Sequence, residues 1–195
     1  MLRRFVVLSL LLLVTLAPAA LAANVKIRVE GKTTTIFGAA QPRVTADNAL
    51  QALDAASTAG EFHYAMTASQ FGDYVSQIGK YPASGSSGWV FKVNGVSSPV
   101  GADKATLKDG DVVLWYYATF GPAGGPPTLE LQRLPGNCYV VQSVTDAGTR
   151  TRASTATLVV DGKRYRARNG RACVGRHVGL VRATAPGAIR SNAQP

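Results

Sequence analysis

Residues that usually carry catalysis or bind metal are scarce in this sequence of 195 residues. It has two histidines and two cysteines. No CxxC pair occurs, and the histidines, His63 and His177, lie in different halves of the chain. The sequence contains no recognisable serine-histidine-acid triad, no spacing of metal ligands and no phosphate-binding loop. The sequence therefore predicts a protein that is not an enzyme and that holds no metal and no cofactor.

A long apolar run is also missing, except near the N-terminus. Arg3 and Arg4 precede the apolar segment Phe5–Leu16, and Ala20-Leu21-Ala22 offers a small-x-small cleavage site. The segment is too short to span a bilayer, which takes about 20 residues. The pattern predicts a signal peptide over residues 1–22 and a secreted or cell-surface protein with no transmembrane span after cleavage. An uncleaved anchor is the alternative.

The two cysteines, Cys138 and Cys173, both lie in the second half of the chain. An even number of cysteines in an exported chain favours a disulfide over a redox or metal role. Closing a loop of about 35 residues restricts the unfolded chain by roughly 4 kcal/mol. We therefore expect a structural disulfide between them.

Acidic residues are few in the same half. Residues 24–127 carry eight Lys or Arg and eight Asp or Glu, whereas residues 128–195 carry eleven basic and three acidic residues, an excess of +8. The segment Gly121–Pro127 (GPAGGPP) between them has the Gly and Pro content of a linker. The sequence thus predicts two domains, 23–120 and 128–195, joined by residues 121–127.

The first domain combines strand patterns with one helix pattern. Apolar and charged residues alternate in Val25–Glu30, as in a half-buried strand, and Thr33–Phe37 would pair with it. Thr45 is the expected cap of the following helix, with Asp47 in its first turn and Gly60 at its end. Further strands are expected at Phe62–Met66, Asp73–Ile78, Gly88–Val93 and Val112–Thr119, and the dipeptide Asn94-Gly95 is typical of a tight turn after the third of these. One helix packed on a mixed or antiparallel sheet is an α+β, β-grasp-like fold.

The expected strand Val112–Thr119 is unusual because both of its faces are apolar or aromatic. A single short helix covers one side of a sheet, so a loop, the second domain or a ligand must cover the other. Exposed aromatic surface often marks an interaction site, and the loop Ser84–Gly88 would let a partner approach. Ordinary packing is the alternative. The aromatic residues that we expect to contact a ligand are Tyr81, Trp89, Phe91, Trp115 and Tyr117.

These segments carry a family resemblance over Asn24–Phe120. They are, in order, VKIRVEG, TADNALQALDAA, FGDYVSQIGK, GWVFKVNG and GADKATLKDGDVVLWYYA. Their order resembles the transcobalamin C-terminal-like domain family, a bacterial domain of unknown function related to the small β domain of vitamin B12 carriers. The resemblance implies a β-grasp-like fold and a ligand-binding module. Cobalamin is a candidate ligand with an incomplete site, because this chain lacks the helical barrel that seats the corrinoid in those carriers.

The second domain is expected to be a small all-β sandwich. Its expected strands are Thr128–Leu134, Cys138–Thr145, Ala156–Val160, Lys163–Arg168 and Val178–Ala183. The pieces ATLVVDGK, NGRACV and LVRATAPGAIRSN resemble the carboxypeptidase-regulatory or transthyretin-like β-sandwich. Asp161-Gly162 is typical of a tight hairpin within it.

A basic face is predicted on this second domain. Arg164, Arg166 and Arg168 alternate along one strand, and Arg171 and Arg176 follow nearby. Guanidinium groups bind phosphate or carboxylate through paired hydrogen bonds. Outside the cytoplasm an anionic cell-envelope polymer is a more plausible partner than nucleic acid. A solvated face without a partner is the alternative.

The leading hypothesis is an exported, non-enzymatic ligand-binding or interaction module, whose partner is an unknown small molecule or an envelope protein. The alternative is a structural or adhesion protein of the cell envelope that binds anionic polymers through its basic C-terminal domain.

Overall fold

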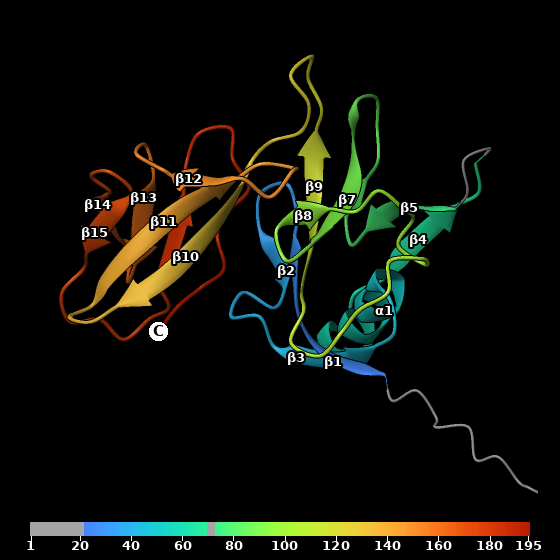
Figure 1. Ribbon diagram of the computed structural model, residues 1–195, viewed down its shortest axis with the longest axis horizontal. Helices are drawn as coiled ribbons and strands as arrows, with labels where there is room; N and C mark the ends of the chain where they lie inside the picture. Colours follow the sequence, from blue (N-terminus) through green and yellow to red (C-terminus); the bar gives the residue numbers. More distant parts are fainter. Residues whose placement is uncertain (1–21, 70–72) are drawn as a thin grey trace, which may run out of the picture.

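The computed structural model describes residues 22–69 and 73–195 and is mostly β-structure (Figure 1). Strands account for 49% of the residues and helix for 7%. The single helix of the described residues is α1 (Ala49–Gly60). The α+β, β-grasp-like expectation is therefore wrong, because many short strands surround this one helix. Among the described residues no helix has the length and apolar character of a membrane span. The predicted signal peptide lies, apart from Ala22, outside the described residues.

The first half is built on a six-stranded sheet. Its path is β2 (Thr35–Phe37), β1 (Ala23–Glu30), β9 (Val112–Thr119), β7 (Ser87–Val93) and β8 (Val96–Ser97), with β3 (Arg43–Ala46) also paired to β1. Strands β1 and β9 are parallel, and the other pairs are antiparallel. A smaller sheet of β4 (Tyr64–Thr67), β5 (Tyr74–Ile78) and β6 (Tyr81–Pro82) lies beside β7.

Alternation along β1 gives this sheet two different faces. Val25, Ile27 and Val29 are fully buried in the core that includes α1. Arg28 and Glu30, also buried, point to the opposite face because successive side chains of a strand alternate. That face is turned toward the second half of the chain, since both side chains contact residues there.

Strand β9 shows what covers the second aromatic face. Val113 and Trp115 belong to the core under α1. Tyr116, with its neighbours Leu114 and Ala118, forms a separate buried cluster against Ile189 of the second half. Of the three covers left open by the sequence, the second half of the chain is the one that packs here.

The helix begins later than the sequence suggested. Asn48 is the cap, and its side chain accepts the N–H of Gln51 at 2.9 Å. Thr45, the expected cap, instead pairs with Asn24 in β3, so that prediction is wrong. The helix ends at Gly60, as the sequence suggested, and the C-cap residue Glu61 that follows it has a left-handed φ of 51°.

The predicted tight turns have the expected backbone. Asn94 and Gly95, between β7 and β8, have φ values of 53° and 85°. Asp161 and Gly162 have φ values of 48° and 72° in the second half. Positive φ at both central residues matches the right-handed twist of a hairpin, so these dipeptides fix the register of their strands.

The second half consists of two small sheets that share one core (Figure 1). One contains β10 (Thr128–Leu134), β11 (Cys138–Val144), β12 (Arg150–Arg152) and β15 (Arg171–Cys173); the other contains β13 (Thr157–Val160), β14 (Lys163–Arg166) and β16 (Arg182–Thr184). The expected strand Val178–Ala183 is wrong in its first part. Asp161 accepts the N–H groups of Val178 and Gly179 at 3.0 and 2.8 Å, which holds them in a loop.

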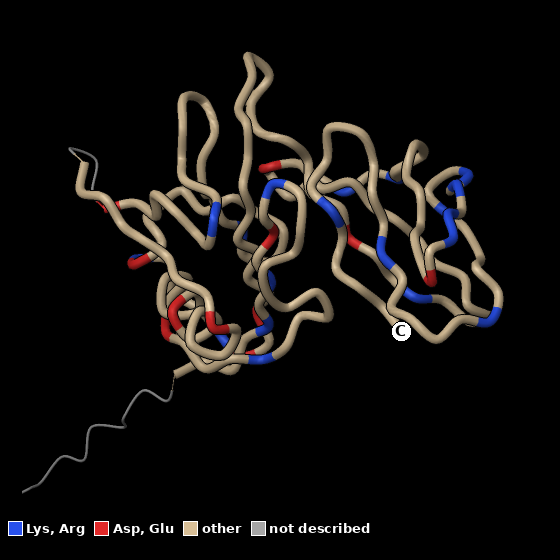
Figure 2. The backbone as a smooth tube through the Cα atoms, turned by 180° about the vertical axis from the view of Figure 1, so that it is seen from behind, with Lys and Arg blue, Asp and Glu red and all other residues tan. Residues whose placement is uncertain are grey.

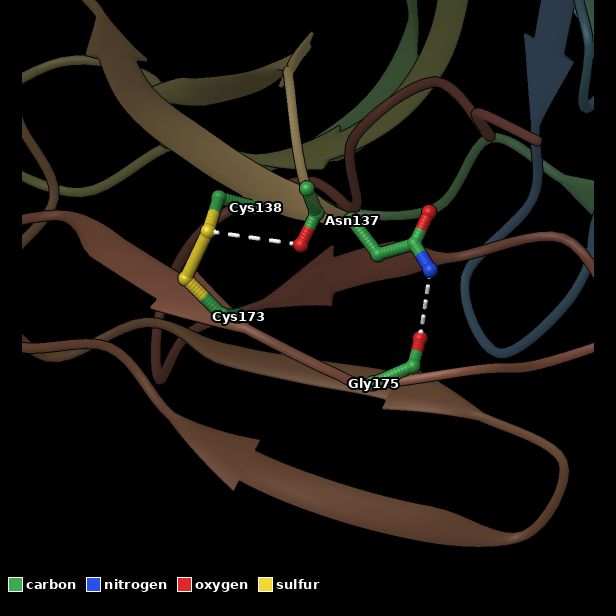
Figure 3. The surroundings of a disulfide bond; sticks show 5 residues. Asn137, Cys138, Cys173 and Gly175 are labelled. Atoms are coloured by element: carbon green, nitrogen blue, oxygen red, sulfur yellow. Dashed lines mark hydrogen bonds between the residues drawn. A yellow bond between two sulfur atoms is a disulfide. The ribbon is translucent and has the colours of Figure 1, made fainter.

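The disulfide prediction is confirmed. Cys138 and Cys173 are directly opposite each other on β11 and β15 and form a disulfide, as Figure 3 shows. Beside it the side-chain amide of Asn137 donates to the carbonyl of Gly175 at 2.9 Å (Figure 3). The bridge therefore fastens the edge strand β15 to the centre of its sheet.

The C-terminal segment is built into the junction between the halves. Asn192 is buried and exchanges two hydrogen bonds with the backbone of Leu131, at 2.8 and 3.0 Å. The N–H of Ala193 donates to the carbonyl of Ala39 in the first half at 2.7 Å. The boundaries 23–120, 121–127 and 128–195 stay a prediction, but residues on both sides of them share one interface.

Candidate functional site

An apolar groove of about 310 Å³ runs along strand β7. Its floor includes Trp89, Val90 and Phe91 of β7, with Trp115 and Tyr116 of β9 beside them. We call it the aromatic groove. Its remaining lining residues are Leu50, Met66, Asp73, Tyr74, Val75, Ser97, Ser98, Gly101, Ala102, Asp103, Phe120 and Asp146. The first half supplies almost all of them, and Asp146 comes from the second half.

The rim of the aromatic groove carries exposed apolar side chains. Met66, Tyr74 and Phe120 are 40%, 47% and 40% exposed. They are three of the seven large apolar side chains that are exposed among the described residues. Their gathering around one groove is the feature that distinguishes a binding surface from singly scattered exposed apolar residues.

The groove continues past its rim toward the serine-rich loop. A second, shallower depression is lined by the loop Ser84–Gly88 and shares Tyr74, Trp89, Val90 and Phe120 with the aromatic groove. The two depressions together follow β7 over most of its length. A ligand that occupies both would have to be elongated.

The charged side chains that line the groove are all acidic. They are Asp73, Asp103 and Asp146. Asp103 pairs with the exposed Lys104 at 3.0 Å, and Asp146 pairs with Lys92 at 3.2 Å. No Lys or Arg is found among the described residues that line the groove, so a cationic group would meet carboxylates there.

Lys92 holds the Asp146 carboxylate in position. Its side chain is fully buried and donates to the carbonyls of Val144 and Thr145 at 3.2 and 2.9 Å. Burial lowers the pKa of Lys92, while Asp146 acts in the opposite direction. Burial also raises the pKa of Tyr116, which therefore stays protonated and donates a long hydrogen bond (3.5 Å) to Asp146. These contacts fix the Asp146 carboxylate at the groove.

Three of the five predicted contact residues line the groove, but mainly as its floor. Trp89 and Trp115 are 7% and 2% exposed. Their indole N–H groups already donate, to the carbonyls of Tyr81 at 2.8 Å and Ala49 at 3.0 Å. The Phe91 ring packs 5.1 Å from that of Trp115. These rings shape the site and leave no free indole donor for a ligand.

Tyr81 and Tyr117, the other two predicted contacts, are not among the residues that line the groove. The Tyr117 ring meets that of Trp89 edge-on at 5.5 Å, and its hydroxyl donates to the carbonyl of Pro82 at 3.1 Å. The Tyr81 hydroxyl lies 2.8 Å from that of Thr33. The Tyr117 ring therefore packs on Trp89, and the Tyr81 ring packs on Tyr117 at 6.1 Å; a ligand role for both stays a prediction.

Sequence reasoning missed the rim. Met66 and Tyr74 lie on paired strands, β4 and β5, and Phe120 follows β9 directly. In the sequence these residues differ from others only in being apolar and lying at the ends of expected strands, next to Asp73 or next to the Gly/Pro segment. No sequence pattern could have placed Asp146 at the groove, because its position depends on how the two halves pack.

The predicted basic face is partly assembled. Arg166, Arg168 and Arg171 line a shallow groove together with Tyr165. Arg168 and Arg171 face each other across a turn, with backbone hydrogen bonds of 2.9 and 3.0 Å. Arg164 and Arg176, also exposed, do not line it. Figure 2 shows that Lys and Arg predominate over the second half, while the first half carries both signs.

The two histidines have ordinary partners. His63 lies 3.2 Å from the side-chain nitrogen of Gln77, and His177 lies 3.0 Å from the hydroxyl of Tyr139. In the part of the chain that the structure describes, no three His, Cys, Asp or Glu side chains come together as a group that could hold a metal ion.

The groove lies largely in a segment that matches a known sequence family. Residues 44–119 match a domain of unknown function, DUF4430. The more specific resemblance to the transcobalamin C-terminal-like family stays a prediction. No curated protein shows a significant match to the chain.

Among solved structures, a protein from Ruminococcus gnavus ATCC 29149 is similar to part of the chain. It was solved at 1.30 Å resolution as a "putative metal binding protein". The two share 14% identity, with 49% of this chain and 95% of the other covered and a TM-score of 0.36. A likeness this distant carries no argument about fold or function here.

Proposed function

We propose that this chain is a non-enzymatic binding protein that acts outside the cytoplasm and holds an elongated, largely apolar ligand with a cationic group in the aromatic groove. The observation that carries the proposal is the exposed apolar rim of Met66, Tyr74 and Phe120 around a groove whose charged lining is entirely acidic. The export pattern of the N-terminus and the disulfide support an extracytoplasmic location.

The size of the groove limits what it holds. Ligand sites for drug-sized molecules range from about 300 to 1,000 Å³, and this one, at about 310 Å³, is at the lower end. A small molecule or one extended stretch of an envelope protein fits that space. A corrinoid would stay mostly outside it, so cobalamin is a weaker candidate than the resemblance suggested.

A titration with three compounds of matched size tests the charge preference. We expect 4-phenylbutylamine to shift the backbone NMR signals of the groove residues, 4-phenylbutanol to do so more weakly, and 4-phenylbutyrate to have little effect. Asp103→Asn should weaken amine binding, whereas Glu61→Gln, an exposed acidic residue away from the groove, should not. Equal binding of all three compounds would contradict the proposed charge preference.

The apolar rim is tested by truncation. Tyr74→Ala and Phe120→Ala should each weaken amine binding about 2- to 12-fold, since an aromatic contact contributes about 0.5–1.5 kcal/mol. Leu180→Ala is the control, because Leu180 is equally exposed (46%) but outside the groove. If neither rim change alters binding, the ligand lies elsewhere. Adding cobalamin to the same series tests the family resemblance directly.

A second candidate function is polyanion binding through the second half. It rests on the convergence of Arg166, Arg168 and Arg171 around one shallow groove. Retention on immobilised polyphosphate should fall with rising salt and should be lost when these three become Ala. Changing Lys163, Arg164 and Arg176 to Ala, three exposed cations outside that groove, should have a smaller effect. Equal losses in the two variants would point to net charge instead of a defined site.

A further inference from the structure

A buried ion cluster joins the two halves of the chain. Glu30 of β1 is fully buried, and its carboxylate accepts hydrogen bonds from three guanidinium groups. Arg28, 2.9 Å away, comes from the same strand. Arg190, also 2.9 Å away, and Arg182 of β16 come from the second half. The side chains of Arg182 and Arg190 are only 20% and 22% exposed.

The charges of this cluster do not balance. Three guanidinium groups surround one carboxylate, which leaves a formal excess of two positive charges. Burial would raise the pKa of Glu30, but the three arginines together lower it, so this carboxylate is ionised near neutral pH. Burial lowers the pKa of Arg28 to about 10, which still leaves it charged. An uncompensated buried charge is strongly destabilising.

Arg28 also has an unused donor. Its Nη1 donates to Glu30 and, at 2.6 Å, to the carbonyl of Arg190. Its Nε is buried and has no hydrogen-bond partner, the one such side-chain nitrogen or oxygen in the described part of the chain. Arg28 as a whole is 2% exposed. Buried polar groups normally find a partner, so an occupant beside this nitrogen is expected.

A small cavity borders Arg28 at the same junction. Its volume is about 30 Å³. It is lined by Arg28, Gln41, Gly95, Val112, Leu114, Thr128, Leu129, Glu130 and Asn192. A water needs about 10–15 Å³ of such volume, so the cavity has room for one small ion or two to three waters. The one carboxylate in its lining, Glu130, is already held by Arg150 at 2.9 Å.

We infer that this cavity binds one small monovalent anion of the halide class, with the buried Arg28 as its principal ligand. The anion would partner the free donor and offset one of the two excess charges. Its binding is independent of the aromatic groove, because none of the groove residues lines the cavity. It would act as part of the joint between the two halves and would stabilise their packing.

Thermal unfolding at constant ionic strength tests the inference. Sodium gluconate, whose anion is too large for the cavity, is replaced stepwise by sodium chloride or bromide. We expect a saturable rise in Tm of about 2–4 °C, since a ligand that binds only the folded state stabilises it by mass action. A bromide-soaked crystal should show an anomalous peak within hydrogen-bond distance of the Arg28 guanidinium.

Two variants make the test specific. Arg28→Lys keeps the charge but lacks the Nε donor, and it should lose the halide-dependent rise in Tm. Arg150→Lys changes the more exposed ion pair with Glu130 at the same junction, and this variant should keep the halide-dependent rise in Tm. Identical Tm values in gluconate and halide, with no bromide peak, would overturn the inference and leave water in the cavity. If Arg28→Lys does not fold, the bromide peak in the unchanged protein decides.

Discussion

Replacing Glu30 by Gln is the change to which the joint between the halves should be most sensitive. The substitution keeps the shape of the side chain and removes its charge. In the unchanged protein three guanidinium groups share the Glu30 carboxylate. In the variant the same three groups would face a neutral amide. Glutamine also has only one acceptor oxygen, whereas both oxygens of Glu30 accept hydrogen bonds.

The size of the effect follows from burial. Removing one partner of a buried ion pair typically costs about 3–5 kcal/mol, because the other charge is left uncompensated. Arg28 has almost no access to water, while Arg182 and Arg190 can recover part of their hydration. We therefore expect Glu30→Gln to lower the free energy of unfolding by about 3 kcal/mol, near the lower end of that range. For a chain of this size that corresponds to a fall in Tm of about 6–12 °C.

Urea unfolding followed by Trp fluorescence measures this loss. The matched control is Glu130→Gln, which breaks the ion pair with Arg150 at the same junction. Both partners of that pair are more than a third exposed, so the control should cost at most about 1 kcal/mol. If Glu30→Gln costs no more than Glu130→Gln, the cluster is not the electrostatic joint described here.

Two further predictions concern acid and reductant. Because the three arginines hold the pKa of Glu30 below its ordinary value of 4.5, its contribution to stability is complete above about pH 4.5 and is lost as the pH falls through the lowered pKa. Urea midpoints measured between pH 6 and pH 3 should therefore fall less steeply for Glu30→Gln than for the unchanged protein. Reducing the Cys138–Cys173 bridge, which closes a loop of 35 residues, should cost about 4 kcal/mol. A Cys138→Ser, Cys173→Ser variant should show the same loss and no response to dithiothreitol; a response would place the effect of the reductant elsewhere.

Local patterns predicted the parts of the fold that depend on local rules. The alternation in Val25–Glu30 and the dipeptides Asn94-Gly95 and Asp161-Gly162 gave strands and turns that the structure contains. The disulfide followed from the number of cysteines and the export signal. The fold class did not follow, because strands of two or three residues, such as β6, β8 and β15, have no detectable period.

The candidate site could be predicted only in part, for a physical reason. Aromatic residues of β7 and β9 stood out in the sequence, but the same pattern fits a core floor and a ligand surface. Burial decides between these roles, and it assigns Trp89 and Trp115 mainly to the floor. The exposed rim, Tyr74 and Phe120, is visible only once the strands are arranged. Two of the three arginine partners of Glu30, Arg182 and Arg190, are separated from it by 152 and 160 residues of sequence.

The packing of the halves also predicts how a fragment of residues 24–120 should behave. Cutting there would uncover the apolar cluster of Leu114, Tyr116 and Ala118 and the charged pair of Arg28 and Glu30. Burying one large apolar side chain contributes about 1.5–3 kcal/mol, so Leu114 and Tyr116 alone account for about 3–6 kcal/mol. We therefore expect the fragment to give poorly dispersed NMR spectra or to self-associate, and to lose binding of 4-phenylbutylamine together with Asp146. A fragment that stays monomeric and folded, and that binds the amine as tightly as the full chain, would show that the second half is dispensable for the groove.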